Sequence, residues 1–568
     1  MAQYRIAILS NFTYDTIVPY LKKVLFSMDS RAEFYLCPFN QYAQEILNPE
    51  SGLYKFNPDV VILALEGERL FADLIEYPYD LENTDKEAII EDILSQIDSF
   101  FQLLTDRLSA MVLFHNFIIP SITPFSVLDT KYVLGVKEIY YKLNTGLCEI
   151  SRRYRSVFVF DIESIGAEFG KKNLREEKLR YLAAMDLTDD FLEVVSKEYL
   201  RYLRPLRGIR KKCLVLDLDN VLWGGIIGED GLSGIRLGHQ APGNAYLSFQ
   251  KAVLGLYKRG IILAVNSKNN FDDAIEAFRK HPEMVLKEEY FASIKINWND
   301  KASNMKEISE EIGIDLDSFV FIDDSPIERK IVRDLLPQVE VPEMPDDAAL
   351  FKNTLMSLQS FESISITEED KKRGSLYLQE KKRRKHKASF QNLDDFLMSL
   401  ETKCYVRNVD EISLSRVCQL IQRTNQFNLT SRRYTETQLQ SFLDKDNILF
   451  LSLSVKDVFG NNGIVGVAII IKGQNEAGDI DTFLISCRVL GRSIEQAFLT
   501  EAINRLKSKG VKRLSATFIP TKKNFPSKDF LKNAGFENIP APGPNMYRWI
   551  LDCEKACKIP KWIEVDNE

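Results

Sequence analysis

The stretch KKCLVLDLDNVLWGG, residues 211–225, predicts the structure of the region around it. Its apolar run, residues 213–216, predicts a fully buried parallel strand. Asp217 and Asp219 follow this strand, and ligands of open α/β sheets bind at the carboxyl ends of the strands. Two close carboxylates repel each other unless a cation or a shared proton intervenes. The pair suits a Mg²⁺ site with one nucleophilic Asp and one general acid/base. A solvated D-x-D loop is the alternative interpretation of these residues alone.

Three later segments supply matching chemical groups. Ser267 follows the apolar strand of residues 261–265 and brings a hydroxyl close to a helix start, where backbone N–H groups favour phosphate. Lys301 begins a predicted helix and supplies a cation. Asp323 and Asp324 follow the strand of residues 318–322. Nucleophile, acid/base, hydroxyl, cation and acidic pair together predict phosphoryl transfer through an aspartyl-phosphate.

These motifs closely resemble those of the haloacid dehalogenase (HAD) phosphotransferase superfamily. The matching positions are the D-x-D-x-[TV] motif at Asp217, Asp219 and Val221, the strand-terminal Ser267, the cation Lys301 (with Lys295 as the second choice), and the acidic pair Asp323 and Asp324. The resemblance implies that Asp217 is the nucleophile and Asp219 the general acid/base. It also implies that Mg²⁺ is held by Asp217, the main-chain carbonyl of Asp219, and Asp324 or Asp323. A degenerate HAD scaffold is the alternative.

The spacing of the HAD motifs leaves no room for a large cap domain between Asp219 and Ser267 or between Ser267 and Lys301. Caps of other superfamily members exclude water from small substrates. Without one, we expect another domain, a partner or a large tethered substrate to cover the site.

Longer phrases resemble the FkbH-like proteins of HAD subclass IIIC, and this resemblance covers nearly the whole chain. The phrases are LDLDNVLWGG (216–225), GEDG (228–231), KINW (295–298), FIDDSPIER (321–329), RTNQFNLT (423–430) and SCRVLGR (486–492). The family implies an enzyme that takes a glyceryl unit from 1,3-bisphosphoglycerate, removes phosphate and loads the unit as a thioester on an acyl carrier protein. Such a reaction belongs to polyketide or other natural-product biosynthesis, or to a surface-polysaccharide pathway. The rivals are a capless HAD phosphatase acting on a phosphosugar or phosphoprotein, and a non-catalytic assembly protein.

The N-terminal region, residues 1–205, resembles the SGNH-hydrolase fold. Short apolar strands are predicted at residues 6–9, 60–63, 111–114 and 157–160, with Ser10 after the first and Asn116 after the third. That fold also needs an Asp-x-x-His pair near the end of the domain. The chain has four His, and none lies between residues 116 and 205. Because a Ser without a base is a weak nucleophile, we expect a degenerate scaffold or docking domain.

The C-terminal region, residues 401–568, resembles GNAT acyltransferases. Strands are predicted at 447–455, 463–471 and 481–489, the first two joined by a turn at 460–463. Cys487 ends the third strand, and the loop and helix after it resemble the R/Q-x-x-G-x-G/A pyrophosphate loop. The resemblance implies that Arg488, Gly491, Arg492 and Ser493 bind the phosphopantetheine of a carrier protein. Cys487 is then either an acyl-carrying nucleophile or a small buried hydrophobe.

Neighbouring polar segments also have two interpretations each. Asn425, Gln426 and Asn428 either orient a glyceryl group or cap a turn. The basic run KKRRKHK, residues 381–387, lies in a helical linker predicted for residues 366–400 and is either a solvated helix face or a docking site for an acidic partner. Thr367 and Asp370 predict a capping box at its start.

Length and composition limit the number of domains, the class of partner and the cellular compartment. A chain of 568 residues is too long for a single hydrophobic core, so we expect an α/β multidomain protein. The predicted segments are residues 1–205, 206–365, 366–400 and 401–568. The central domain is expected to hold a Rossmann-like parallel sheet. A net charge of −7 argues against nucleic acid as a partner. The eight Cys form no C-x-x-C pair and suggest a reducing compartment. The sequence shows neither a signal-peptide layout nor a membrane-spanning apolar stretch, so we expect a cytoplasmic protein.

Overall fold

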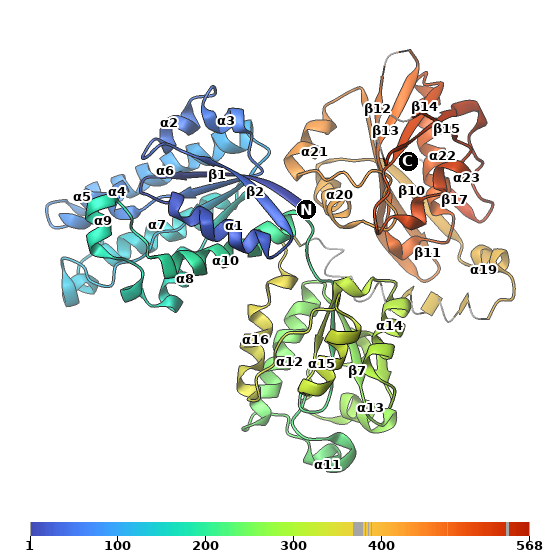
Figure 1. Cartoon of the computed structure of the whole chain (residues 1–568), viewed down its shortest axis with the longest axis horizontal. Helices are drawn as coiled ribbons and strands as arrows, with labels where there is room; N and C mark the ends of the chain where they lie inside the picture. The colour runs from blue at the N-terminus through green and yellow to red at the C-terminus, as the bar shows by residue number, and fades with distance from the viewer. Residues whose placement is uncertain are drawn as a thin grey trace. The chain divides into compact units, whose positions relative to one another are not determined.

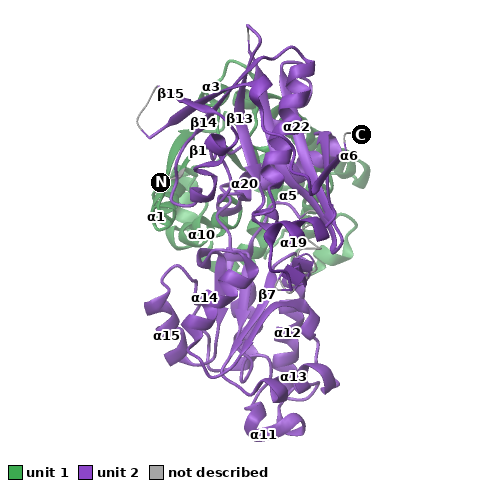
Figure 2. Cartoon of the chain, turned by 90° about the vertical axis from the view of Figure 1, so that its right-hand side faces the viewer, with its two compact units in different colours: residues 1–203, 435–438 green, residues 204–434, 439–568 purple. Residues whose placement is uncertain are grey.

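The computed structural model describes residues 2–366, 389–473, 475–540 and 545–566, together with residues 376, 379–380, 382–383 and 386–387. It contains three sheets, of five, four and eight strands, with helices packed on them (Figure 1). The predicted α/β multidomain class is therefore confirmed. The chain divides into two compact units (Figure 2): unit 1 comprises residues 1–203 and 435–438, and unit 2 comprises residues 204–434 and 439–568. Among the described residues, no helix combines the length and apolar character needed to cross a membrane.

Unit 1 is built on a five-stranded parallel sheet with the order β2-β1-β3-β4-β5. The strands are β1 (Ala2–Ser10), β2 (Ser30–Leu36), β3 (Val60–Ala64), β4 (Met111–His115) and β5 (Val157–Phe160). Helices α6 (Asn83–Arg107) and α7 (Val136–Ser151) cover the face that carries Ala7, Val61 and Val112. On the other face, Tyr4 donates a hydrogen bond of 3.0 Å to the carbonyl oxygen of Leu203 in α10 (Asp189–Leu206).

The central part of unit 2 holds a four-stranded parallel sheet with the order β8-β7-β6-β9. The strands are β6 (Cys213–Leu216), β7 (Ile262–Ser267), β8 (Phe291–Ile296) and β9 (Phe319–Ile322). Helices α14 (Lys301–Ile312) and α15 (Pro326–Leu335) cover the face of Cys213 and Val215. Helices α12 (Gly243–Lys258) and α16 (Phe351–Ser357) cover the face of Leu214 and Leu216. Because both faces are covered, all four residues of β6 are fully buried, as its unbroken apolar run predicts.

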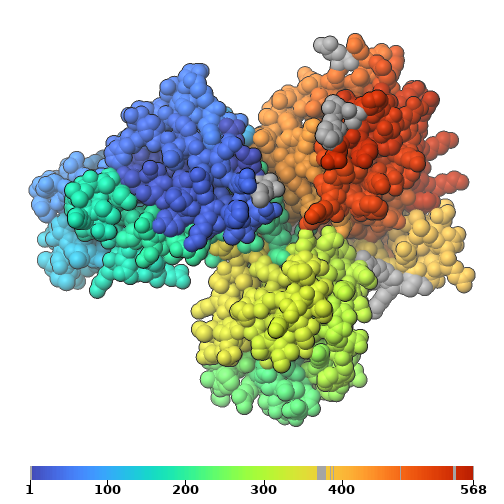
Figure 3. Space-filling model, in the orientation of Figure 1, coloured from blue at the N-terminus to red at the C-terminus, as the bar shows by residue number. Residues whose placement is uncertain are grey.

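No separate cap domain interrupts this sheet. All residues between β6 and β8 are described, and their regular elements are α11 (Ile227–Gly234), α12, β7, α13 (Phe271–Lys280) and a short 3-10 helix at Glu288–Tyr290. Helix α11 packs against α13. In the space-filling view the green segment that contains α11 forms a continuous surface with the yellow-green segment after it (Figure 3). The predicted absence of a large cap is therefore confirmed.

The C-terminal part of unit 2 holds an eight-stranded sheet with the order β15-β16-β14-β13-β12-β11-β10-β17. The strands are β10 (Thr402–Asn408), β11 (Ile448–Asp457), β12 (Gly460–Lys472), β13 (Ala477–Ile485), β14 (Arg513–Phe518), β15 (Glu537–Ile539), β16 (Tyr547–Asp552) and β17 (Ile563–Asp566). Successive side chains of a strand point to opposite faces of this sheet. Helix α20 (Glu411–Arg423) packs on the side chains of one face, and α22 (Ile494–Ser508) packs on those of the other.

Two details of this sheet differ from the prediction. The turn between β11 and β12 lies at Val458 and Phe459, so residues 460–463 belong to β12. The Asp457 carboxylate stabilises the turn at this earlier position, because it accepts hydrogen bonds from the N–H groups of Phe459 (2.9 Å) and Gly460 (3.2 Å). The third strand ends at Ile485 rather than at residue 489, and Cys487–Val489 form a 3-10 turn.

One member of the basic linker run is buried. Arg383 is 2% exposed and holds the Asp457 carboxylate with two hydrogen bonds, of 2.6 and 2.9 Å. Arg492 donates a third, of 3.0 Å, to the same carboxylate. The interpretation of the basic run as a solvated helix face is therefore wrong for Arg383, because the charge of this residue is neutralised inside the domain. The capping box predicted at Thr367 and Asp370 lies outside the described residues.

Candidate active site

The HAD-motif residues meet at one edge of the four-stranded sheet. Asp217 directly follows β6, Ser267 ends β7, and Asp323 follows β9. Leu216 of β6 pairs in register with Val265 of β7 and Ile322 of β9, so these strands end level with one another. The structure thus brings together groups that are 50 or more residues apart along the chain, as parallel pairing requires.

Lys301 lies between two of the carboxylates. Its Nζ donates to Asp217 Oδ2 at 2.7 Å and to Asp323 Oδ2 at 2.5 Å, and its side chain is 3% exposed. Burial lowers the pKa of Lys301, but attraction to the two carboxylates outweighs burial and raises it above its ordinary value. Lys295 pairs instead with Glu307 and Glu311, at 2.6 and 2.5 Å. Of the two lysines proposed by the motif, Lys301 is therefore the one beside Asp217.

Buried amides that the sequence analysis missed hold Lys301 in place. Asn266 Nδ2 donates to the Lys301 carbonyl oxygen at 2.9 Å, and Asn304 Nδ2 donates to Asn266 Oδ1 at 3.1 Å. Both amides are fully buried. Asn266 directly precedes Ser267, which is itself 1% exposed, so the network also connects the ends of β7 and α14.

Three carboxylates form a compact cluster. Asp217, Asp323 and Asp324 each offer an oxygen, and these atoms lie within 4.8 Å of one another. Burial, followed by repulsion from Asp217, raises the pKa of Asp323 to about 7 and also raises that of Asp324. Arg329, which the motifs did not predict, is buried and donates to the carbonyl oxygens of Asp323 (2.9 Å) and Asp324 (2.7 Å). Converging carboxylate oxygens with unfavourable mutual repulsion fit a hard divalent cation such as Mg²⁺.

The side chain of Asp219 lies outside the carboxylate cluster. Its Oδ1 accepts from Trp223 Nε1 at 2.8 Å and from the Ile227 N–H at 3.1 Å, and its Oδ2 accepts from Asn269 Nδ2 at 2.7 Å. Burial raises the pKa of Asp219 above its ordinary value. Asp219 follows from the D-x-D motif, whereas no motif predicts Trp223 or Asn269 as residues of the site.

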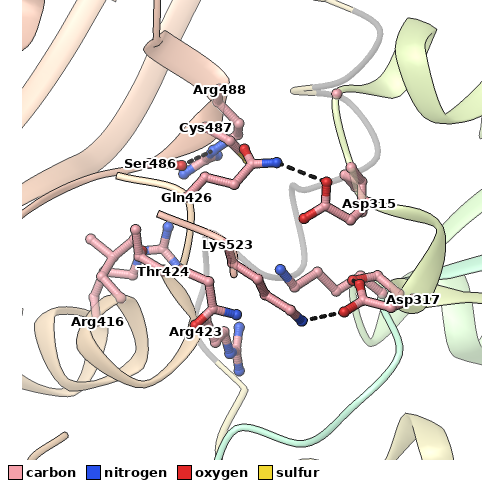
Figure 4. A pocket seen from close by; sticks show the side chains of 16 residues that line it. Asp315, Asp317, Arg416, Arg423, Thr424, Gln426, Ser486, Cys487, Arg488 and Lys523 are labelled. Carbon is pink, nitrogen blue, oxygen red and sulfur yellow. Dashed lines mark hydrogen bonds and ion pairs between the residues drawn. The ribbon is translucent and has the colours of Figure 1, made fainter. Parts of the chain in front are cut away.

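A pocket in unit 2 contains Cys487 (Figure 4). Five basic and two acidic side chains line it: Lys212, Arg416, Arg423, Arg488, Lys523, Asp315 and Asp317. Gln426 Nε2 donates to Asp315 Oδ1 at 3.0 Å, and Lys523 pairs with Asp317. Cys487 is a free, partly exposed thiol, so a small buried hydrophobe is not an adequate description of it.

The residues of the predicted pyrophosphate loop have different surroundings. Arg488 lines the pocket, and its Nε donates to Ser486 Oγ at 3.4 Å. Arg492 is buried and donates to Asp457 and, at 2.7 Å, to Glu380, so its guanidinium is engaged inside the domain. Gly491 (φ +78°) and Ser493 (φ +59°) both adopt left-handed backbone before α22.

The neutral amides before α21 (Glu436–Leu443) differ in their roles: one caps a turn and two line the pocket. Asn428 is fully buried, and its Oδ1 accepts from the Ser431 N–H at 2.9 Å, so it caps a turn. Asn425 Oδ1 accepts from the Arg433 guanidinium. Asn425 and Gln426 line the pocket, whereas Asn428 does not.

Unit 1 has its own cleft at the carboxyl ends of β3 and β4. Glu66, His115, Asn116, Arg175 and Asp186 are its polar lining residues. Ser10 is not part of the lining, and its hydroxyl donates to the Phe12 carbonyl oxygen at 2.7 Å. His115 Nε2 is hydrogen-bonded to the Tyr199 hydroxyl instead. Ser10 and His115 therefore do not form a nucleophile–base pair.

The stability of unit 1 should fall as the pH falls from about 6.5. Burial lowers the pKa of His115 to about 3, whereas the unfolded chain has a value of about 6.5. As the pH falls, the unfolded state therefore binds a proton before the folded state does, and the free energy of unfolding decreases until the pH reaches about 3. At pH 5 this decrease amounts to about 2 kcal/mol. Hydrogen exchange of β4 amides, corrected for intrinsic rates, measures the free energy of unfolding. His115→Gln should remove most of this pH dependence, while the exposed control His239→Gln should preserve it.

Comparisons with known proteins agree with this geometry. Residues 21–203 match the family described as FkbH, N-terminal domain. The chain is 32% identical to the N-terminal part of a Bacteroides fragilis protein containing a phosphatase domain, whose crystal structure is a complex with Mg. That match covers 64% of this chain and 96% of that chain, with a TM-score of 0.58.

Weaker structural matches concern acetyltransferases. Ribosomal-protein-S18-alanine N-acetyltransferase from Escherichia coli is 14% identical, over 26% of this chain and 94% of that chain, with a TM-score of 0.22. A GNAT-family acetyltransferase from Streptococcus pneumoniae is 19% identical, over 26% and 99%, with a TM-score of 0.21. Comparison with curated protein sequences finds no match.

The 32% identity extends over 96% of the crystallised N-terminal part of the Bacteroides fragilis protein, and the FkbH N-terminal match covers most of unit 1. The site described above carries every HAD motif residue at the edge of its sheet. The chain therefore belongs to the FkbH-like family and contains a HAD-type phosphatase domain.

Proposed function

We propose that this protein is a glyceryl transferase and phosphatase. It takes a glyceryl unit from 1,3-bisphosphoglycerate, removes phosphate at the HAD site and loads the unit on the phosphopantetheine thiol of an acyl carrier protein. The observation that carries the proposal is the combination, within unit 2, of a phosphoryl-transfer site and a partly exposed thiol in a basic pocket.

The phosphatase half of the reaction uses the groups around Asp217. The Asp217 carboxylate attacks the phosphorus atom of the phosphate ester, the bond from phosphorus to the ester oxygen breaks, and that oxygen leaves with the electron pair, while the acyl phosphate is kept for the transfer to Cys487. Asp219 supplies its proton, and then takes a proton from the water that hydrolyses the aspartyl-phosphate. Lys301, only 2.7 Å from Asp217, compensates negative charge on the transferring group.

Asp217, Asp323 and Asp324, with the main-chain carbonyl of Asp219, would hold Mg²⁺. When bound, Mg²⁺ neutralises charge on the phosphoryl oxygens and on the converging carboxylates. Arg329 keeps the acidic turn in the required orientation through its two carbonyl contacts.

The transferase half of the reaction uses Cys487. Its thiolate attacks the acyl-phosphate carbonyl carbon, a C–S bond forms, and the C–O bond to phosphate breaks with the electron pair leaving on phosphate. The carrier-protein thiolate then attacks the thioester and releases Cys487. A lining of five basic against two acidic side chains favours a donor that carries phosphate groups.

Mass spectrometry of the carrier protein and of the enzyme tests this proposal. Incubation of the wild type with 1,3-bisphosphoglycerate and Mg²⁺ should add one glyceryl mass to the carrier protein. Cys487→Ala should abolish that addition while leaving phosphate release from a simple phosphomonoester within about twofold of wild type. Cys557→Ala replaces another partly buried free thiol of the C-terminal part of unit 2 and is the matched control. This variant should load the carrier protein at the wild-type rate. Loading by Cys487→Ala at the wild-type rate would contradict the thiol relay.

A capless phosphatase acting on a phosphoprotein or phosphosugar is the second candidate. Each strand of the four-stranded sheet is followed by an exposed apolar side chain: Ile226, Phe271, Trp298 and Ile327. Such a rim suits contact with a macromolecule that brings its phosphate into an uncapped site. Rapid phosphate release from many monoesters, with no acyl-enzyme at Cys487, would favour this candidate.

A further inference from the structure

The Asp219 carboxyl is held by donors from three separate segments. Trp223 belongs to the turn after β6, Ile227 begins α11, and Asn269 lies in the loop after β7. Both oxygens of Asp219 accept at 2.7 to 3.1 Å, so its side chain has one strongly preferred orientation. A group that must pass a proton to a substrate oxygen works only if it is held in a productive position.

The two side-chain donors are themselves fixed by their surroundings. Trp223 is fully buried, and its ring packs edge-on against Phe278, with centroids 5.9 Å apart. A buried indole N–H needs an acceptor, and Asp219 supplies it. Asn269 is 4% exposed, and its Oδ1 accepts from the Asn270 N–H at 3.1 Å, which directs its Nδ2 toward Asp219. Neither side chain contacts Asp217 or Lys301 in the hydrogen bonds of the site.

This arrangement leaves Asp219 able to exchange a proton. Each carboxyl oxygen has two lone-pair positions, and the three donors use three of these four positions. The indole and amide donors only donate, so they fix the direction of the carboxyl without competing for its proton. These three bonds leave one position, which a leaving-group oxygen or an attacking water would occupy during the reaction.

We propose that Trp223 and Asn269 are positioning residues that hold Asp219 for both proton transfers of the phosphatase reaction. The inference rests on the HAD-type phosphatase activity and not on glyceryl transfer. In the first transfer, Asp219 protonates the leaving oxygen as its bond to phosphorus breaks. In the second, Asp219 removes a proton from the water whose oxygen bonds to the phosphorus of the aspartyl-phosphate.

The dependence of the rate on the leaving group tests the proposal. Acetyl phosphate has a leaving group that needs little protonation, whereas phenyl phosphate depends more on an acid. Trp223→Phe and Asn269→Ala should each lower kcat/KM for phenyl phosphate by roughly 10- to 100-fold, while kcat/KM for acetyl phosphate changes less than about threefold. Because water activation is also impaired, aspartyl-phosphate on Asp217 should accumulate with acetyl phosphate, as measured by mass spectrometry of acid-quenched enzyme.

The chain offers a matched control for each variant. Trp549→Phe alters a partly buried Trp of β16 in the eight-stranded sheet, and Asn270→Ala alters the exposed neighbour of Asn269. Both controls should preserve the wild-type ratio of the two kcat/KM values and accumulate no aspartyl-phosphate.

Three results would overturn the inference. Equal losses with both substrates and no phosphoenzyme would mean that Trp223 and Asn269 only support folding, and unchanged rates would mean that Asp219 needs neither. Absence of phosphate release by the wild type from both probes would remove the phosphatase activity on which the inference rests. Failure of carrier-protein loading, by contrast, would contradict the proposed glyceryl transfer and leave this inference intact. Because Trp223 is buried, thermal unfolding of each variant should be compared, and Asn269→Ala decides the outcome if Trp223→Phe does not fold.

Discussion

Asp217→Asn should abolish phosphate release, with kcat falling by at least about 10⁴-fold. An amide cannot attack phosphorus, so no aspartyl-phosphate forms and the effect should be the same for good and poor leaving groups. The variant also replaces one of the two carboxylates bonded to Lys301, and one of the three clustered carboxylates, by a neutral amide. Release of inorganic phosphate under saturating Mg²⁺ measures the loss, and acid-quenched mass spectrometry should detect no phosphoenzyme.

Asp272→Asn is a suitable control for this variant. Asp272 lies in the first turn of α13, is exposed, and is not among the clustered carboxylates. Its replacement should leave kcat within about twofold of wild type. Retention of more than a few per cent of activity by Asp217→Asn would show that another group is the nucleophile.

Lys301→Met should impair both catalysis and stability. Met replaces a buried cation by an apolar chain of similar length, and leaves Asp217 and Asp323 facing each other without compensation. Removing one partner of a buried ion pair costs about 3–5 kcal/mol. In the presence of a chelator, the thermal unfolding transition of this domain should therefore shift to lower temperature, and kcat should fall by roughly 10²- to 10³-fold.

Lys295→Met is the matched control, because the sequence motif alone allows either lysine. Lys295 pairs with Glu307 and Glu311, which are half-exposed, and pairs of that kind contribute little to stability. This variant should keep its activity and most of its stability. A larger loss of kcat for Lys295→Met than for Lys301→Met would reverse the assignment of the cationic residue.

The location of the phosphoryl-transfer site could be predicted because its residues directly follow apolar strands. Parallel strands buried on both faces have an unmistakable apolar pattern, and their carboxyl ends meet at one edge. Ser267 is the last residue of β7, and Asp217 and Asp323 directly follow β6 and β9. Their residue types and order were therefore sufficient to predict both their proximity and the chemistry that they support.

The supporting residues could not be predicted in the same way. Trp223, Asn269 and Arg329 carry no periodic signal, and their importance depends on which carboxylate or carbonyl their donors reach. The same holds for the choice between Lys295 and Lys301, since both stand near the same strand end in the sequence. Only the packing of α14 on the sheet directs Lys301 toward Asp217.

The α/β class, the order of the strand-end acids and the absence of a large cap follow from the sequence alone, because they depend on local apolar runs and on the chain length between motifs. The pairing of charges depends on the tertiary structure. Arg383, from a predicted helical linker, and Arg492, from a predicted loop, both neutralise Asp457 in the interior. Asp219 faces Trp223 and Asn269 rather than the carboxylate cluster. A buried charge must find a partner wherever the fold provides one, and that partner can lie anywhere along the chain.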